Sequence, residues 1–291
     1  MKNGCPRILL ILFVLIVSAA EVLSAGELAR LVRLKISAGD LLSGAAAIED
    51  YKRKNGVDGE YLDALGWLAR GAEMFGKLDM ATQLVAELRR EIREEKPDLI
   101  IPLGSAIEVE GKLQARKDKR NAIAFLEQEY SRARDLALRA RIRKSINELS
   151  LEGQPAPAFN GLVKGKPVLL FLWAHWCGDC RSQAETLARI YQKYKAQDLV
   201  VIAPTRLYGT GDQNKPASAD EEKAHIAKVW SDVYRGLEDV AIPIDTETMI
   251  RYGVSATPTF VFIDKRGIVR FYAPTRLSEV ELSNRIESIL K

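Results

Sequence analysis

Two cysteines separated by two residues are the groups in this sequence best suited to chemistry. Cys177 and Cys180 follow an apolar run over 168–173 that has the length and composition of a buried strand. A cysteine that opens the next helix has free backbone N–H groups beside its sulfur, and these stabilise a thiolate. The second sulfur then lies one turn away. The spacing predicts a reversible dithiol–disulfide couple, because so small a loop makes a poor structural staple.

The N-terminus has the pattern of an export signal. Lys2 and Arg7 precede an apolar run over 8–17, and small residues follow it. The run is shorter than the ~20 residues that a membrane span needs. We predict that 1–25 is a signal peptide and that the protein is exported, to the periplasm; an uncleaved membrane anchor is the alternative. Removal of this segment would take Cys5 with it and leave two cysteines.

Charge and length limit the class of protein. The chain has 291 residues, enough for two domains with separate cores. Its net charge of +4 comes from 43 basic and 39 acidic residues, a balance too even for a nucleic-acid-binding protein. We therefore expect protein partners and no nucleic acid.

Residues 26–151 are predicted to form an all-α domain. Apolar residues recur at helical spacing, and three similar turns, at Gly39-Asp40, Gly76-Lys77 and Lys117-Asp118, each precede a small residue. The turns lie 37 and 41 residues apart, more than the roughly 34 of a tetratricopeptide repeat. A helical-hairpin array that binds a partner protein, a tetratricopeptide-like domain and an irregular bundle are all compatible with this pattern.

A basic run lies in the second half of this helical region. Between Lys112 and Lys144 there are eleven Lys or Arg residues and four acidic ones. Such a run is typical of a solvated helix face, and a surface for an acidic partner is the alternative.

Residues 152–158 are predicted to be a linker, because two prolines and a glycine end the helical pattern. Alternating strands and helices after it predict an α/β domain over 159–291, with a central sheet flanked by helices. The expected strands are 168–173, 199–203, 261–263 and 268–272, and the expected helices are 177–195, 220–236 and 278–290. The polar connection over 205–220 is unusually long, and we expect it to flank the dithiol and to help select partners.

The second half resembles the thioredoxin superfamily, and within it the exported thiol–disulfide oxidoreductases of the TlpA type. The resemblance covers roughly 150–291. It rests on motifs that agree in order and spacing: Gly153-x-x-Ala156-Pro157-x-Phe159, Gly165-Lys166-Pro167-Val168-Leu169, Trp173-Ala174-x-Trp176-Cys177-Gly178-x-Cys180-Arg181, and Tyr252-Gly253-Val254-x-Ala256-Thr257-Pro258-Thr259.

The resemblance implies a role for each residue around the dithiol. Cys177 would be the exposed attacking thiolate, and Cys180, which is more buried, would resolve the mixed disulfide. Trp176, Thr257 and Pro258 would form the substrate-binding surface, with a cis peptide before Pro258 in place of an ordinary turn proline. The resemblance implies neither a cofactor nor a metal.

Several residues depart from the family pattern and are candidates for redox tuning. Asp179 stands where proline is common; its carboxylate either disfavours the Cys177 thiolate or points into solvent, where screening leaves little effect. His175 is either an exposed loop residue or a proton donor. Phe171 replaces a buried aspartate, which removes the usual proton relay. Gln183 and Glu185 stand where the relatives commonly have Glu and Pro. The missing proline predicts a straighter helix, and Glu185 is either a proton-transfer group or a surface residue.

These observations predict an exported enzyme that reduces protein disulfides through Cys177 and Cys180. The direction follows from Asp179, which opposes the low cysteine pKa typical of strong oxidants. A membrane-bound electron donor would then be required. Two alternatives are a disulfide oxidase or isomerase, and a non-catalytic scaffold in which the helical domain binds partners.

Overall fold

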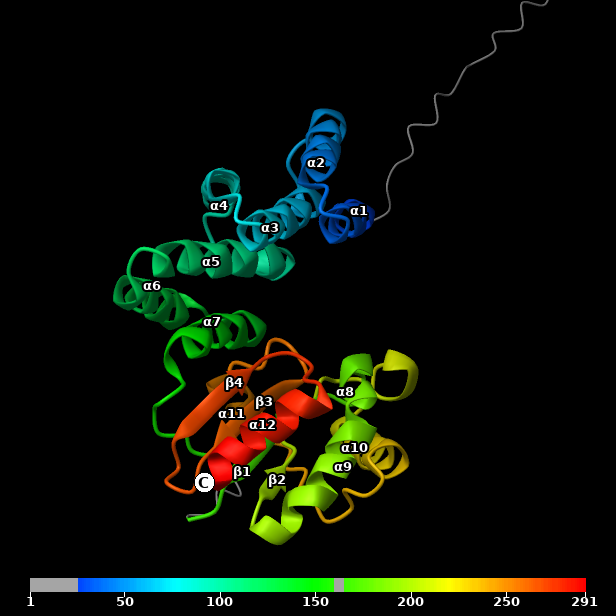
Figure 1. The fold of residues 1–291 in the computed structure, drawn as a ribbon. Helices are drawn as coiled ribbons and strands as arrows, with labels where there is room; N and C mark the ends of the chain where they lie inside the picture. Colours follow the sequence, from blue (N-terminus) through cyan, green and yellow to red (C-terminus); the bar gives the residue numbers. More distant parts are fainter. Residues whose placement is uncertain (1–25, 160–164) are drawn as a thin grey trace, which may run out of the picture.

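A computed structural model describes residues 26–159 and 165–291 and contains a helical domain followed by a mixed sheet with flanking helices (Figure 1). The predicted signal segment, 1–25, lies outside the described residues. Within the described ranges, no helix is both long enough and apolar enough to cross a membrane.

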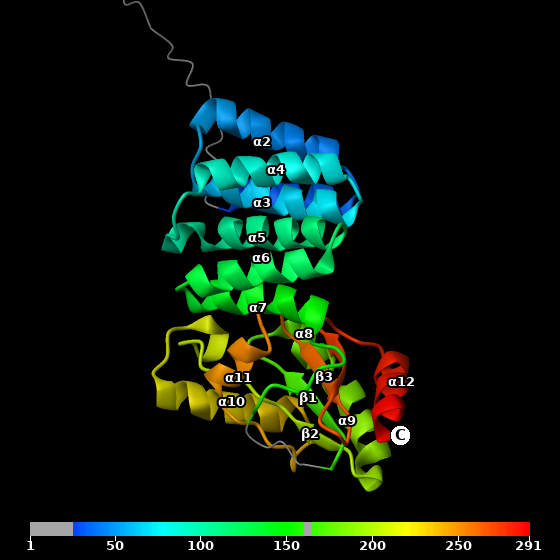
Figure 2. The ribbon, with the colours of Figure 1, turned by 90° about the vertical axis from the view of Figure 1, so that its left-hand side faces the viewer.

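The helical domain is built from helices packed in two layers. Helix α3 packs against both α1 and α5, and α5 packs against α7; α2, α4 and α6 form the second layer (Figures 1 and 2). This agrees with the predicted all-α region. The elements are α1 (Glu27–Ser37), α2 (Leu41–Asn55), α3 (Gly59–Met74), α4 (Leu78–Glu91), the 3-10 turn η1 (Pro97–Leu99), α5 (Ile100–Ala115), α6 (Lys119–Arg132) and α7 (Leu136–Ser150).

The three similar turns of the sequence occupy equivalent places in the structure. Asp40, Lys77 and Asp118 are the N-cap residues of α2, α4 and α6, the three helices of the second layer. The small residues that follow these turns are buried, and Ala81 and Ala122 are fully inaccessible. A small side chain lets two helices approach closely. The turns therefore mark successive helical hairpins, and a tetratricopeptide assignment stays a prediction.

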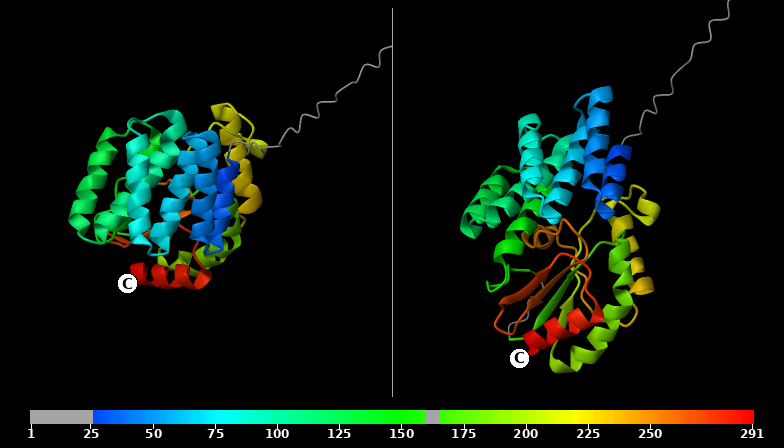
Figure 3. Two further views of the ribbon diagram at one scale, coloured as in Figure 1. Left: turned by 90° about the horizontal axis from the view of Figure 1, so that it is seen from above. Right: turned by 45° about the horizontal axis from the view of Figure 1, so that its top comes forward.

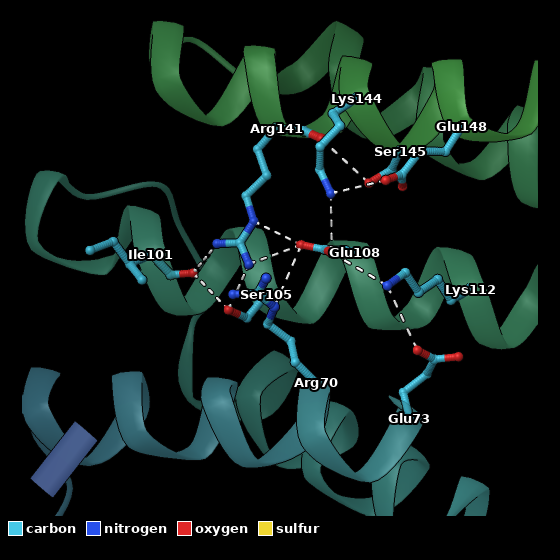
Figure 4. Close-up of polar contacts among 10 residues, drawn as sticks. All are labelled: Arg70, Glu73, Ile101, Ser105, Glu108, Lys112, Arg141, Lys144, Ser145 and Glu148. Atoms are coloured by element: carbon cyan, nitrogen blue, oxygen red, sulfur yellow. Dashed lines mark hydrogen bonds and ion pairs between the residues drawn. The ribbon is translucent and has the colours of Figure 1, made fainter. Parts of the chain in front are cut away.

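Part of the basic run packs inside the helical domain around one buried carboxylate (Figure 4). Glu108 is 3% exposed, and its oxygens lie 3.1 Å from Arg141, 3.3 Å from Lys144, 3.5 Å from Lys112 and 3.8 Å from Arg70. Burial alone would raise the pKa of Glu108, but the four cations outweigh it and the pKa is lowered.

The solvated-face interpretation is therefore wrong for Arg141 and Lys144. Their side chains are only 15% and 11% exposed, because they neutralise Glu108 inside the domain. Glu108 lies on α5, Arg70 on α3 and Lys144 on α7, so this one carboxylate joins three helices of the same layer. The sequence did not reveal this pairing, because Glu108 lies 36 residues before Lys144.

The sheet has four strands in the order β2-β1-β3-β4. β1 runs parallel to β2 and antiparallel to β3, and β3 runs antiparallel to β4. The four predicted strands are confirmed, although β3 begins two residues earlier than expected. Their bounds are β1 (Val168–Leu172), β2 (Val200–Ile202), β3 (Thr259–Ile263) and β4 (Val269–Ala273).

Both faces of the sheet are covered, as the continuous apolar composition of its central strands predicts. Leu169 and Phe171 of β1 pack into one core with α9 (Ala184–Tyr194), α10 (Ala219–Val233) and α12 (Glu279–Leu290). Alternate residues of β1 pack into a second core with α11 (Thr246–Arg251), on the side of the helical domain (Figure 3). Two short 3-10 turns, η2 (Lys195–Gln197) and η3 (Asp212–Asn214), complete the domain.

The prediction of a straighter helix after the cysteines is wrong. The helix breaks at Gln183, which separates α8 (Gly178–Ser182) from α9. The N–H of Gln183 bonds the carbonyl of Cys180, a tighter turn than an α-helix makes, and the Gln183 side chain accepts from Leu277 N at 2.8 Å. A long-range hydrogen bond thus holds the break without proline. Helix α11 was also not predicted.

The stretch over 152–158 is hydrogen-bonded along β4. Gly153 N donates to Val269 O at 2.8 Å, Val269 N donates to Gln154 O at 2.9 Å, and Ala156 N donates to Gly267 O at 2.9 Å. The residues predicted to form a linker therefore extend the edge of the sheet. This arrangement leaves little freedom between the two parts of the chain.

Helix α7 joins the helical domain to the sheet by packing against α11 and β4. Asn147 Nδ2 donates to Arg251 O at 3.1 Å. Gly253 follows α11 at φ +64°, and a Cβ there would lie 2.2 Å from the backbone nitrogen of Lys144. Only glycine permits this close approach of two backbones.

Replacing Gly253 tests how much this contact stabilises the protein. We expect Gly253→Ala to lower the free energy of unfolding by more than about 2 kcal/mol, because the new methyl group must displace backbone. The matched control is Gly267→Ala, which has φ +80° but nothing within 4 Å of its Cβ, and should cost only about 1 kcal/mol. Urea unfolding of both variants measures the difference. Equal losses would show that the close contact contributes nothing.

Candidate active site

The two cysteines of the Cys-x-x-Cys motif form a disulfide at the start of α8. Cys177 is the N-cap residue of this helix and Cys180 lies in its first turn, with their Cα atoms 5.2 Å apart. The backbone N–H of Cys180 donates to Cys177 Sγ at 3.0 Å. When the disulfide is reduced, this N–H is positioned to stabilise a thiolate on Cys177, as the sequence predicts.

Cys177 is less exposed than the sequence suggests. It is 5% exposed, and Cys180 is fully buried. The order of burial is as expected, but the expectation of an openly exposed Cys177 is wrong. The reason is that its sulfur is bonded to Cys180 and lies 3.4 Å from the carbonyl oxygen of Thr257.

Hydrogen bonds fix the chain between β1 and the cysteines. Trp173 follows β1 directly, and its indole N–H donates to Ala203 O at 3.0 Å while its carbonyl accepts from Thr205 Oγ1 at 2.8 Å. His175 lies two residues after Trp173, and its carbonyl accepts from the guanidinium of Arg181 at 2.9 Å. The motif is therefore held by β1, by the segment after β2 and by α8.

The loop before β3 closes the site from the opposite side. The Thr257–Pro258 peptide is cis, as the resemblance implies. It brings the Thr257 carbonyl to Cys177, while Pro258 itself is buried. Trp176 is 45% exposed next to Cys177. The structure thus brings Trp176, Thr257 and Pro258 to the two cysteines, where an extended substrate can pair with free backbone groups.

Asp179 and Glu185 both face solvent. The Asp179 side chain is 62% exposed and lies 3.6 Å from Arg276, so a cation offsets its charge. The Glu185 side chain is 88% exposed and pairs with Arg189. The surface interpretation of Glu185 is confirmed. At such exposure water screens both carboxylates strongly, so Asp179 matches the solvent-facing alternative and contributes little to the direction of electron transfer.

The floor of the site is apolar. Phe171 is fully buried and packs against Phe260 and Tyr234, with ring centroids 5.2 Å and 5.8 Å away. Burial raises the pKa of Tyr234, and its buried hydroxyl has no hydrogen-bond partner in the described chain. Phe171 therefore fills with a phenyl ring the position at which the family resemblance implies a buried aspartate.

The interpretation of His175 as an exposed loop residue is wrong. Its side chain is fully buried, with Nδ1 3.7 Å from Glu222 Oε1. The His225 ring lies at right angles to it, with centroids 5.2 Å apart, and the Tyr208 ring lies at 5.9 Å. Burial lowers the pKa of His175 despite the nearby carboxylate. The imidazole is therefore neutral near pH 7.

Tyr208 and Glu222 are the residues of this region that sequence reasoning missed. Tyr208 lies in the long connection that we expected to flank the dithiol. The centroid of its ring is 5.3 Å from the centroid of the Trp176 ring. The length of that connection was the available signal. Glu222 carried none, because it is one of three consecutive acidic residues in the first turn of a helix, and acidic residues there are common at a protein surface.

The burial of His175 gives the stability of the protein a pH dependence with a defined sign. Because its pKa is lower in the folded state, the unfolded chain binds the proton more readily below its ordinary pKa of about 6.5. The free energy of unfolding should fall by up to about 1.4 kcal/mol per pH unit as the pH drops below that value.

We expect His175→Gln to remove this part of the slope between pH 6.5 and the pKa of the folded protein. Urea unfolding at pH 7.5, 6.5 and 5.5 measures it in both proteins. An identical slope in the variant and the natural protein would contradict the assignment.

The C-terminal half of the chain is similar to known thiol–disulfide oxidoreductases. A profile of the Redoxin family matches residues 143–284. The thiol:disulfide interchange protein DsbE of Xylella fastidiosa is 27% identical over 159 residues, which cover 50% of this chain and 72% of that protein. The thiol-disulfide oxidoreductase ResA of Bacillus thuringiensis is 31% identical over 107 residues, covering 37% of this chain and 54% of ResA. A crystal structure described as a thiol:disulfide interchange protein DsbE, from Chlorobium tepidum, is 25% identical, with a TM-score of 0.39, over 48% of this chain and 98% of its own.

The C-terminal half of the chain is therefore a redoxin-like thioredoxin domain, preceded by an all-helical region. Within that class it is a thiol–disulfide oxidoreductase domain similar to DsbE and ResA, with Cys177 and Cys180 as its disulfide. Among the described residues, no group of three or more His, Cys, Asp or Glu side chains could hold a metal ion.

Proposed function

We propose that this protein is an exported reductase of protein disulfides. The observation that carries the proposal is the Cys177–Cys180 disulfide, held beside the free carbonyl of a cis-proline loop and an exposed tryptophan. A thiol pair in this setting can exchange with a cystine on an extended polypeptide.

The reduced protein would act in two exchange steps. The Cys177 thiolate attacks one sulfur of the substrate disulfide, which forms a mixed disulfide and releases the other substrate sulfur as a thiolate that takes a proton. Cys180 then loses its proton and attacks Cys177 Sγ, which closes the internal disulfide and releases the second substrate thiol. The protein ends oxidised by two electrons, and a membrane-bound electron donor would restore the dithiol.

Three further elements of the proposal come from the sequence. Residues 1–25 would direct export to the periplasm, with cleavage or retention as an anchor both open. The helical domain over 26–151 would bind a partner protein. Trp176, Thr257 and Pro258 would bind the substrate, while any effect of Asp179, His175 and Glu185 on the redox properties would be small.

Trapping the mixed disulfide tests the catalytic roles. Cys180→Ser should accumulate a covalent complex with substrate proteins, because nothing resolves the bond to Cys177. Cys177→Ser is the matched control and should trap at least about tenfold less, since Cys180 is fully buried. The measurement is non-reducing electrophoresis of the tagged full chain recovered from cells, with mass spectrometry of the partners. Equal trapping by both variants would refute the assigned roles, and no trapping by either would refute the reductase.

The reduction potential tests the direction of transfer. We expect a value more negative than about −200 mV on equilibration with dithiothreitol buffers, and a value near −120 mV would identify an oxidant instead. Asp179→Asn should raise the potential by only about 10 mV, because the carboxylate is exposed and paired with Arg276. A much larger shift would show that Asp179 controls the couple.

A further inference from the structure

A second aromatic ring stands beside the exposed tryptophan of the site. Trp176 and Tyr208 have centroids 5.3 Å apart and rings at 86° to each other, a favourable edge-to-face contact. Tyr208 is partly exposed and belongs to the connection between β2 and α10, which Figure 1 shows next to α8. The Arg206 guanidinium lies 4.7 Å from the Tyr208 centroid. The surface next to Cys177 therefore includes an aromatic residue from outside the cysteine motif.

A buried carboxylate fixes the backbone that carries this ring. Glu222 lies on α10 and is fully inaccessible. Its Oε1 accepts from Tyr208 N at 2.6 Å, and its Oε2 accepts from Gly209 N at 2.8 Å. Charge-assisted hydrogen bonds that are shielded from water are strong and directional. They leave Tyr208 little freedom to move away from Trp176.

The buried ring of His175 packs against the ring of Tyr208. It is fully buried between Glu222, His225 and Tyr208, with Arg181 holding its backbone carbonyl. Neither of its ring nitrogens makes a well-formed hydrogen bond among the described residues, although the backbone of Thr210, in the same connection as Tyr208, approaches the ring. A polar ring so poorly paired is unfavourable by itself. Its ring contacts are made with the connection that carries Tyr208 and with α10.

We propose that Tyr208 is a specificity-determining residue, which forms with Trp176 a surface for an aromatic or large aliphatic side chain next to the substrate cysteine. Glu222 and His175 are positioning residues that act through Tyr208. This inference rests on the proposed disulfide reductase function. The ion pair between Asp179 and Arg276 offsets these two charges, and the Arg206 guanidinium lies against the Tyr208 ring, so the proposed surface selects mainly by apolar contact.

The experiment uses the reduced full chain and two symmetrical peptide disulfides. These are the disulfide dimers of acetyl-Gly-Cys-Phe-Gly-amide and acetyl-Gly-Cys-Ser-Gly-amide, with hydroxyethyl disulfide as a probe of the thiol chemistry alone. Tryptophan fluorescence in a stopped-flow instrument gives the rate of oxidation by each. We expect the natural protein to react about fivefold faster with the Phe peptide than with the Ser peptide.

Tyr208→Ala should reduce this ratio to below about twofold, while Tyr208→Phe should keep it, because the ring and not the hydroxyl makes the contact. Glu222→Gln should also lower the ratio, since one of the two accepting oxygens becomes an NH2 group that cannot accept a backbone N–H. The matched control, Tyr51→Ala in the helical domain, should leave the ratio unchanged. Thermal unfolding of each variant establishes that it is folded.

The outcomes separate this inference from the function on which it depends. A natural protein that reacts with both peptides at equal rates, or a Tyr208→Ala variant that keeps the full ratio, would overturn the role of Tyr208 and leave the reductase intact. A natural protein that reacts with neither the peptides nor hydroxyethyl disulfide would overturn the proposed function itself.

Discussion

The burial of both faces of β1 is the constraint on which the rest of the structure depends. All five residues of this strand are fully inaccessible, and alternate side chains enter two different cores. Burying five large apolar side chains contributes roughly 1.5–3 kcal/mol each before entropy is counted. The strand cannot slip by one residue without exchanging these two sets of side chains. Its end therefore has a fixed position, and the cysteine motif begins five residues beyond it.

The second core also explains why the helical domain is not an independent attachment. Leu151, which follows α7, packs in the same core as Val168 and Leu170 of β1. Helix α7 is held on its other side by the ion pairs of Glu108 with Arg141 and Lys144. A displacement of α7 would disturb a sheet core and a buried charge cluster together. The structure thus gives the helical domain a defined orientation toward the dithiol domain.

The parts of the structure that were predictable from the sequence are those set by local spacing. The Cys177–Cys180 pair and the strand before it follow from one contiguous motif, whereas the cis peptide before Pro258 was implied by the family resemblance and not by spacing. The break at Gln183 and the pairing of 152–158 with β4 were not predictable, because each depends on hydrogen bonds to residues about 100 positions away.

The prediction that His175 is exposed was wrong for a similar reason. In the sequence it lies between the predicted strand and the cysteine motif, where a loop is expected, and loop residues are usually exposed. In the structure it is covered by Tyr208, by Glu222 and by His225, all more than 30 residues further along the chain. The residues around the cysteine motif carry no information about which side chains the later connection and α10 will cover.

The burial of each charged residue around the site determines how strongly that residue influences the site. The departures that stand out in the sequence, Asp179 and Glu185, are 62% and 88% exposed and each has an arginine beside it. Water and a counter-charge leave such carboxylates little influence on a buried sulfur. Glu222, by contrast, is inaccessible and makes two charge-assisted bonds to the connection beside the site. Interactions in a region of low dielectric are stronger and more directional than those at the surface. The buried carboxylate outside the motif therefore shapes the substrate-facing surface more than the exposed ones within it.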